Sequence, residues 1–245
     1  MGEIIAMVSG KGGTGKTTAA AYLGAALARR GEKTLLIDLN FRMDDLPVLL
    51  GAQNRVSYHL LDVIEGNCRI IQALIPCGNP SDLFLLPASR ERELLQVPKK
   101  SFLKLTGLLK ESFGHILIDA PSGFSDGLDY ALAAADAAVI VSDFGRLSVR
   151  DSGMLLAHQG FQGVRKSVLL NRFDRKLLRE EKTLSPEEAV AEIGEPLLGI
   201  VPESEALLLS AEEGSMTNDT RDPAYRSFER IAGRIDGEDI PIHLK

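Results

Sequence analysis

Residues 10–18 constrain the fold of this 245-residue chain more than any other stretch. Residues 10–17 match G-x-x-x-x-G-K-[ST], a pattern whose backbone N–H groups surround phosphates while its lysine reaches them. The apolar run 4–8 predicts a buried strand before this loop, and the alanine-rich segment 17–30 predicts a helix of about four turns after it. Such a loop directs unpaired N–H groups and the positive end of a helix dipole at an anion. The sequence therefore predicts a phosphate-binding loop, rather than a chance glycine-rich turn.

Each residue type in this loop has an expected role in holding a nucleoside triphosphate. We expect Lys16 at the β- and γ-phosphates, Thr17 at a Mg²⁺ ion and Thr18 at the α-phosphate. The glycines let the backbone curve around phosphates with no Cβ in the way. The predicted phosphate-binding residues are Gly10, Lys11, Gly12, Gly13, Thr14, Gly15, Lys16, Thr17 and Thr18.

Composition narrows the class of protein. Apolar residues make up 44% of the chain and charged residues 25%, which is ordinary for a globular protein. The net charge of −6 argues against bulk binding of nucleic acid. Cys68 and Cys77 lack metal-ligand spacing and are expected to be free thiols, and the four histidines are scattered. With no apolar run of membrane-spanning length and no signal peptide, we expect a cytoplasmic protein.

Strand-like and helix-like segments alternate along the rest of the chain. Strands are expected at 33–39, 83–86, 115–119, 137–142, 167–170 and 198–201; helices at 45–50, 56–65, 69–74, 101–113, 128–135, 148–159, from 185 onward, 204–212 and 222–235. Ser101 is the expected N-cap of one helix and Gly114 its expected C′ residue, Ser148 and Asp151 form a candidate capping box, and Ser185 precedes a proline at a strong helix start. The alternation predicts an α/β fold, a mostly parallel sheet with helices on both faces, in a single domain over residues 1–245.

Polar residues follow several of the predicted strands. Ligands bind beyond the carboxyl ends of strands in open parallel sheets, so these residues are expected to converge near the loop. Asp119 follows an apolar strand and is the candidate ligand of Mg²⁺, directly or through water. Asp38 ends its own strand and is expected to face the metal or the attacking water. The alternative for both is a capping or turn role.

Lys11 is not needed to cradle phosphates. The pattern K-G-G-x-G-K-T-T at residues 11–18 resembles the loop of the MinD/ParA family of ATPases, in which the early lysine reaches the nucleotide of the other subunit. Residues 62–66, 72–75, 86–89, 148–152 and 199–203 also resemble the MinD branch of this family, in order, so the resemblance extends from about residue 3 to about residue 235. It implies a P-loop NTPase fold, ATP or ADP with Mg²⁺ as cofactors, and an ATP-dependent homodimer. A protein partner near Ser148–Ser152 is a further implication.

The resemblance also implies where the purine lies. Asn171, followed by Arg172, is expected to contact the adenine edge, and the loop at Pro202 and Glu203 to close over the base. An asparagine side chain offers adenine both a donor and an acceptor. A turn-initiating role for Asn171 is the alternative.

Asn40 departs from the family pattern. Members usually carry Asp-x-Asp after the second strand, and the second carboxylate orients the hydrolytic water. Asparagine can place a water but cannot accept its proton, so hydrolysis is expected to be slow or absent. The candidate catalytic residues are thus Lys11, Lys16, Asp38 and Asn40. In the alternative, Asn40 faces solvent and Asp44 or Asp45 supplies the carboxylate.

Other functions within the same family stay open. Residues 233–245 lack the basic amphipathic helix by which MinD proteins bind membranes, so no direct membrane anchor is expected. An FlhG-type regulator of flagellar number and a ParA-type partition ATPase are alternatives. The latter needs a basic face for DNA, and the cluster Arg172, Arg175, Lys176, Arg179 and Lys182 is interpreted as a solvated loop. A non-hydrolysing, ATP-gated scaffold is the alternative from another class, motivated by Asn40.

Overall fold

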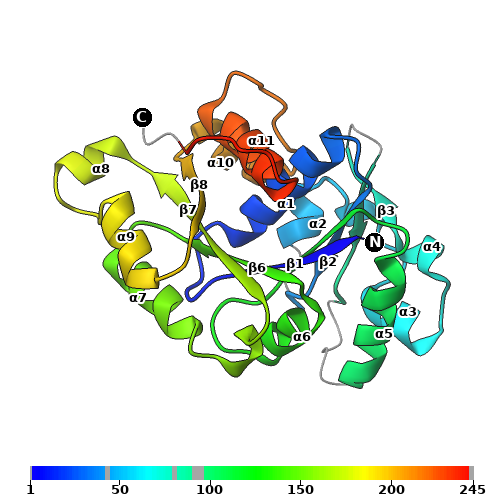
Figure 1. Ribbon diagram of the computed structural model, residues 1–245. Helices are drawn as coiled ribbons and strands as arrows, with labels where there is room; N and C mark the ends of the chain where they lie inside the picture. The colour runs from blue at the N-terminus through cyan, green and yellow to red at the C-terminus, as the bar shows by residue number, and fades with distance from the viewer. Residues whose placement is uncertain (1, 42–44, 79–81, 90–96, 243–245) are drawn as a thin grey trace.

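The computed structural model describes residues 2–41, 45–78, 82–89 and 97–242, which contain one eight-stranded sheet (Figure 1). The strand order is β3-β4-β2-β5-β1-β6-β7-β8, and every neighbouring pair is parallel except β3 with β4. The strands are β1 (Glu3–Val8), β2 (Thr34–Asp38), β3 (Ile75–Pro76), β4 (Leu83–Leu86), β5 (His115–Asp119), β6 (Ala137–Ser142), β7 (Arg165–Phe173) and β8 (Leu197–Pro202). This arrangement confirms the predicted α/β class.

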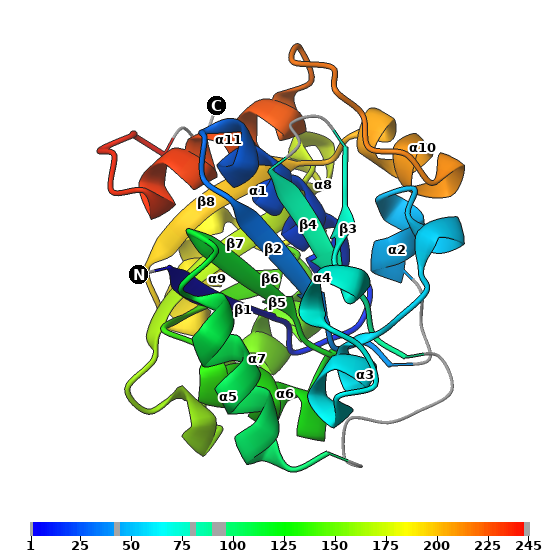
Figure 2. The ribbon, with the colours of Figure 1, turned by 90° about the vertical axis from the view of Figure 1, so that its right-hand side faces the viewer.

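Helices cover both faces of the sheet (Figure 2). The first face carries α1 (Lys16–Arg29), α2 (Asp45–Leu49), α10 (Glu205–Glu213) and α11 (Pro223–Ile235). The opposite face carries α3 (Leu60–Glu65), α4 (Ile70–Ala73), α5 (Lys99–Leu109) and α6 (Asp126–Ala134), and extends to α7 (Arg146–Leu155) and α9 (Pro186–Ile193). The short helices η1 (Gln53–Arg55), η3 (Gln159–Phe161) and α8 (Arg175–Arg179) complete the described elements. Alternate residues of the central strands face these two layers: Ile5 and Met7 the first, Ile4 and Ala6 the second.

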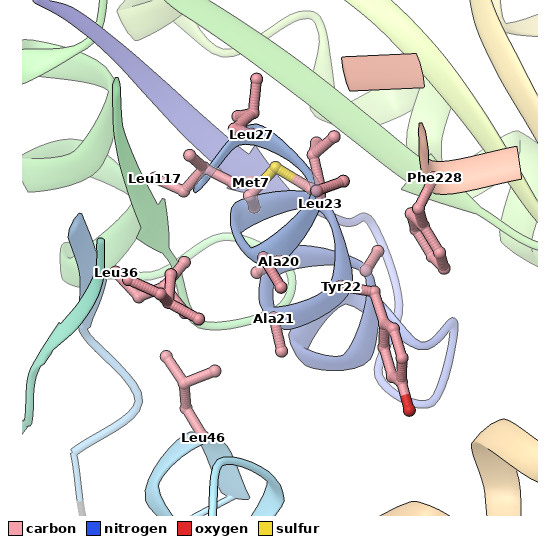
Figure 3. Packing of buried hydrophobic residues seen from close by; sticks show 14 of the residues in the cluster. Met7, Ala20, Ala21, Tyr22, Leu23, Leu27, Leu36, Leu46, Leu117 and Phe228 are labelled. Atoms are coloured by element: carbon pink, nitrogen blue, oxygen red, sulfur yellow. The ribbon is translucent and has the colours of Figure 1, made fainter. Parts of the chain in front are cut away.

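Helix α1 is the centre of the first layer (Figure 3). Its alanines allow close approach to the sheet, and Leu23 and Leu27 pack there with Met7. Tyr22 stacks on Phe228 of α11 with 5.6 Å between ring centroids. The loop that leaves β1 therefore ends on a helix that is buried along most of its length.

Several predicted boundaries were wrong for identifiable reasons. Ser101 does not cap its helix, because α5 begins at Lys99 after Pro98. The C-cap is Lys110, so Gly114 lies too far along the chain to be the C′ residue. Ser148 forms no capping box, because α7 already begins at Arg146 and Ser148 is buried. The helix expected at 56–65 begins only at Leu60. The two-residue strand β3 was not predicted, and it is shorter than a pattern of hydrophobicity can reveal. The interpretation of the basic cluster as a solvated loop was wrong for Arg175, Lys176 and Arg179, which lie on the helix α8 behind its cap Asp174.

The helix start predicted at Ser185 is confirmed. The Ser185 hydroxyl accepts a hydrogen bond from the Glu188 N–H, and the Glu188 carboxylate accepts one from the Ser185 N–H. Pro186 occupies the first helical position. These contacts span three residues, so local sequence suffices to predict them.

Candidate nucleotide-binding site

The carboxyl ends of three adjacent strands bring the candidate residues together. Strand β1 lies between β5 and β6, so its connection to α1 emerges where the chain topology reverses. Strands β2 and β5 pair in a register that sets Asp38 opposite Asp119, while Asp119 also pairs with Met7 of β1. The two carboxylates among the predicted metal ligands are therefore neighbours beside the start of the loop.

The loop between β1 and α1 has the backbone of an anion cradle. Gly13 and Gly15 adopt left-handed conformations, with φ of 85° and 82°. A Cβ added at Gly13 meets no atom within 4 Å, so the space above that residue is open. A Cβ at Gly10 would lie 2.3–2.5 Å from the backbone of Asp151 and Ser152, so the loop needs glycine there to pack against α7.

Asp119 accepts hydrogen bonds from three residues that the sequence analysis selected. Lys16 Nζ lies 2.5 Å from Oδ1, the Thr17 hydroxyl donates to Oδ2 at 2.7 Å, and the Asn40 side-chain amide donates to Oδ2 at 2.8 Å. Lys16 and Asp119 are both buried. Asn40 thus turns into the site, contrary to the alternative in which it faces solvent.

Asp38 is a buried carboxylate with one oxygen left free. Its side chain is 1% exposed; Oδ1 accepts the Asn40 backbone N–H at 2.8 Å, and Oδ2 has no partner. Burial, and secondly the charge of Asp119, raises the pKa of Asp38 well above its usual range. An orphaned carboxylate oxygen next to Asp119 and the Thr17 hydroxyl matches the oxygen ligands that Mg²⁺ takes, so this set of residues fits the ion.

Two adjoining clefts open at this edge of the sheet. The phosphate cleft, of about 630 Å³, is lined by Gly12, Gly13, Thr14, Gly15, Lys16, Thr17, Thr18, Asn40, Asp45, Val48, Leu49, Ser122, Arg172 and Ala211. The base cleft, of about 110 Å³, is lined by Gly15, Thr18, Asn171, Arg172, Pro202, Glu203, Ser204, Leu207, Leu208 and Ala211. Four residues line both clefts: Gly15, Thr18, Arg172 and Ala211. The predicted phosphate-binding residues from Gly12 to Thr18 and the predicted purine contacts therefore line one continuous depression, whereas Gly10 and Lys11 are not among its lining residues.

The base cleft fixes the orientation of Asn171. This side chain is 7% exposed, and its amide nitrogen donates to the Thr14 carbonyl at 2.8 Å. The next residue, Arg172, has φ of 60° in a break of the β7–β8 register. Its Nε lies 3.9 Å from Oε2 of Glu203, on the loop after β8. The Asn171 side chain therefore donates one hydrogen bond to the phosphate-binding loop, and its carbonyl oxygen stays available as an acceptor. Arg172 and Glu203 form the rim of the base cleft.

Several lining residues were missed by the sequence analysis. Val48 and Leu49 of α2 form a wall of the phosphate cleft beside Asp45, which the sequence analysis did name, and Leu207 and Leu208 of α10 form a wall of the base cleft. Their spacing marks them as parts of amphipathic helices, but no local pattern tells which ligand such a helix will border. Asp44 lies outside the described residues, so only Asp45 of the two alternative carboxylates can be placed.

The segment expected to contact a partner is only partly accessible. Ser148 and Ser152 are buried, and the Ser148 hydroxyl lies 3.0 Å from that of Ser142. These two serines are therefore not accessible to a partner, whereas Arg150 in the same segment is exposed, and a partner near residues 148–152 stays a prediction. The exposed residues on α7 include Leu147, Arg150 and Met154, and Lys11 is exposed at the start of the loop.

Comparison with known proteins places this site in a family. Residues 5–217 match the CobQ/CobB/MinD/ParA nucleotide binding domain. The chain belongs to this family. It is 35% identical to the septum site-determining protein MinD of Synechocystis, over 99% of this chain and 92% of that protein. The comparisons thus confirm the predicted MinD/ParA resemblance.

Two solved structures share the fold over nearly the whole chain. MinD in the MinC:MinD cell division complex of Aquifex aeolicus superposes with a TM-score of 0.90 at 33% identity, covering 98% of both chains. MinD of Pyrococcus horikoshii, solved with Mg-ADP, gives 0.85 at 27% identity and covers 96% of both chains. These relatives confirm the expectation of a MinD-like ATPase with a nucleotide and Mg²⁺ as cofactors. In the described part of the chain, no helix is both long and apolar enough to cross a membrane.

Proposed function

We propose that this chain is a Mg-ATP-dependent switch of the MinD type, in which residues 1–245 act as one cytoplasmic ATPase domain. The ATP-bound form pairs with a second copy and recruits a protein partner, in the service of spatial regulation such as placement of the division site. The convergence of Lys16, Thr17 and Asn40 on Asp119 is the observation that carries this proposal.

The residues of the phosphate cleft divide the work of holding the triphosphate. When bound, Mg²⁺ neutralises charge that develops on the β- and γ-phosphates. Thr17, Asp38 and Asp119 hold the ion, and the free Oδ2 of Asp38 supports this role. Lys16 exchanges its carboxylate partner for phosphate oxygens, a charge-assisted contact of the same kind. The N–H groups of Gly12, Gly13 and Gly15 complete the cradle, together with Gly10, Thr14 and Thr18.

The base cleft favours adenine through a single acceptor. Because the Asn171 amide nitrogen is engaged by Thr14, its oxygen is the atom free to accept from the exocyclic amine of adenine. Arg172, Pro202 and Glu203 enclose the base from the outer side, which agrees with their place on the rim.

Lys11 and the exposed face of α7 support pairing of two copies. Lys11 is exposed next to Gly12, which lines the phosphate cleft, and a lysine that reaches another subunit must be exposed. Leu147 and Met154, seven residues apart on α7, are 56% and 55% exposed. Phe124, in the segment between β5 and α6, is 62% exposed. The MinD relative from Aquifex was solved in complex with MinC, which supports a protein partner for this chain as well.

A second candidate function is an ATP-gated scaffold that does not hydrolyse its nucleotide. The observation favouring it is Asn40, whose amide contacts Asp119 where the family usually has a carboxylate. In both functions ATP binding drives the pairing, and turnover separates them.

The test of the switch measures molecular mass by light scattering with a slowly hydrolysed ATP analogue. Wild type is expected to shift from monomer to dimer. Lys11→Ala is expected to bind nucleotide in calorimetry yet stay monomeric, because its lysine acts on the other copy. Lys16→Ala is the matched control and is expected to lose nucleotide binding itself. A Lys11→Ala protein that dimerises like wild type contradicts the proposed role of Lys11.

A further inference from the structure

Helix α10 presents two leucines to solvent, with acidic residues one turn before and one turn after them. Leu208 and Leu209 are 50% and 52% exposed. Glu205 precedes them by one turn, and Glu212 and Glu213 follow by one turn; all three are exposed. Within the described residues, none of these three glutamates has an ion-pair partner, so the acidic face of α10 carries uncompensated negative charge beside half-exposed apolar surface.

This face is connected to the nucleotide site. Leu208 lines the base cleft while half of its surface stays open, and Ala211 lines both clefts. Helix α10 also packs against α2: a Cβ at Gly51, just after α2, would lie 3.0 Å from the carbonyl of Gly214, the C-cap of α10. The position of the acidic face is thereby fixed to the walls that enclose the nucleotide.

Helix α8 carries the opposite charge at the same edge of the sheet. Arg175, Lys176 and Arg179 are exposed, and within the described chain none of them has an ion-pair partner. Leu177 and Leu178 between them are half-buried. Asp174 caps the helix by accepting from the N–H groups of Lys176 and Leu177, so the cations are held on a formed turn.

The two helices follow adjacent parallel strands, α8 after β7 and α10 after β8, and they are separate elements in the fold (Figure 1). Across the described residues, no hydrogen bond or ion pair joins α8 to α10 of the same chain. Complementary faces at the nucleotide edge are thus left unsatisfied within one copy. Two copies related by a twofold axis can pair both faces at once, because α8 of each copy then contacts α10 of the other.

We propose that the occupant of the α10 face is α8 of a second copy, and that this contact forms in the ATP-bound pair. The inference rests on the proposed function, since it names a surface of the homodimer that the switch requires. Burial of Leu208 and Leu209 supplies apolar contact, while the flanking charges set partner choice and register. Because Leu208 also borders the base cleft, pairing and nucleotide binding share a wall.

The test reverses charge on one helix at a time. The α10 variant is Glu212→Lys with Glu213→Lys, and the α8 variant is Arg175→Glu with Lys176→Glu. Both reversals agree with the helix dipole, since lysines enter the last turn of α10 and glutamates the first turn of α8, so folding is spared. The matched control, Glu111→Lys with Glu192→Lys, makes the same change in net charge as the α10 variant, at exposed positions near the ends of α5 and α9.

Each variant alone should pair at least about tenfold more weakly than wild type in sedimentation velocity with the slowly hydrolysed ATP analogue, because like charges then face each other. An equimolar mixture of the two variants should pair more tightly than either variant alone, since in the mixed dimer one contact joins the two reversed helices and the other joins the two unchanged ones, and both are complementary. The mixture should therefore pair as well as wild type within about threefold. The control variant should pair like wild type, and the affinity for ADP, which does not drive pairing, should be unchanged in all three.

Four outcomes decide the matter. If either variant alone pairs like wild type, or if the mixture fails to pair while both components still bind nucleotide, the α8–α10 contact is overturned. The neutral pair Glu212→Gln with Glu213→Gln gives a check independent of reversed charge, and an unchanged dimer there also counts against the contact. A wild type that stays monomeric with the analogue overturns the proposed switch itself, which is a different result.

Discussion

Lys16 and Asp119 form a buried ion pair, with Nζ 2.5 Å from Oδ1 and side-chain exposures of 5% and 1%. A bound phosphate and this carboxylate compete for the same ammonium group. A metal ion bound by Asp119 prevents this carboxylate from competing with phosphate for Lys16. Metal binding is therefore linked to the availability of Lys16 for the nucleotide. This link can be measured without turnover.

Asp119→Asn is expected to raise the affinity for ADP in the presence of a chelator, and to abolish the gain that Mg²⁺ gives the wild type. A hydrogen bond to a charged group contributes about 1.5–3 kcal/mol, so the metal-free affinity should rise roughly 10–100-fold. Calorimetry with ADP, with and without Mg²⁺, measures both effects. An equally weak metal-free affinity in the variant would show that Asp119 does not restrain Lys16.

Asn40→Asp is expected to accelerate hydrolysis with Mg²⁺ present. The amide lies 2.8 Å from Asp119, so a carboxylate there stands beside the metal ligands and can orient and deprotonate water. General-base assistance typically contributes about 10²–10⁴ in rate. Steady-state phosphate release should therefore rise at least about tenfold over wild type.

Asp45 provides the control for that experiment, since it also lines the phosphate cleft. Asp45→Ala should leave wild-type turnover unchanged if position 40 governs the water. Brisk wild-type turnover that Asp45→Ala abolishes, with no gain from Asn40→Asp, would assign the role to Asp45 instead.

At the scale of the element, two glycines within helices show separately the effect of helix propensity and the effect of core packing. Gly107 lies within α5 and is exposed, and a Cβ added there would meet no atom within 4 Å. Gly24 lies within α1, where a Cβ would meet Leu36 Cδ2 at 2.7 Å in the core. Glycine therefore lowers the stability of α5 at position 107, whereas at position 24 of α1 it is needed for packing against β2.

Gly107→Ala is expected to raise the free energy of unfolding by about 0.5–1 kcal/mol, because alanine loses less backbone entropy in a helix. Gly24→Ala is expected to lower it by about 1–3 kcal/mol, because the buried Leu36 must shift in a packed layer. Urea denaturation of the two variants beside wild type measures both changes. A stabilised Gly24→Ala protein would mean that α1 and β2 can separate without cost.

Sequence reasoning worked well for elements whose determinants lie within a few residues. The cap at Ser185 and the loop from Gly10 to Thr17 are of this kind, since their contacts or their motif lie within one short stretch of chain. The sequence-based prediction was wrong at Ser101 and Ser148, because both predicted N-caps lie inside their helices. Ser148 is instead held by the end of β6, a partner that no local pattern identifies.

At the scale of the whole molecule, the alternation of strands and helices predicted a parallel sheet covered on both faces, and the structure confirms it. The strand order was not predictable in the same way. Strand β5 lies between β2 and β1 although it follows both far along the chain, because pairing depends on packing among helices far apart in sequence. That order is what makes Asp38 and Asp119 neighbours.

The sequence by itself determined the phosphate-binding loop, the fold class and the residue types offered to nucleotide and metal, because motif, periodicity and composition are local properties. Only the tertiary structure decided that Asn40 contacts Asp119, 79 residues away, and that Asn171 bonds to Thr14 across 157 residues. It also decided that α2 and α10 wall the two clefts. Contacts between residues so far apart in sequence form only when the strands pair in their final register. Residues of the same type then differ in burial and in hydrogen-bond partners.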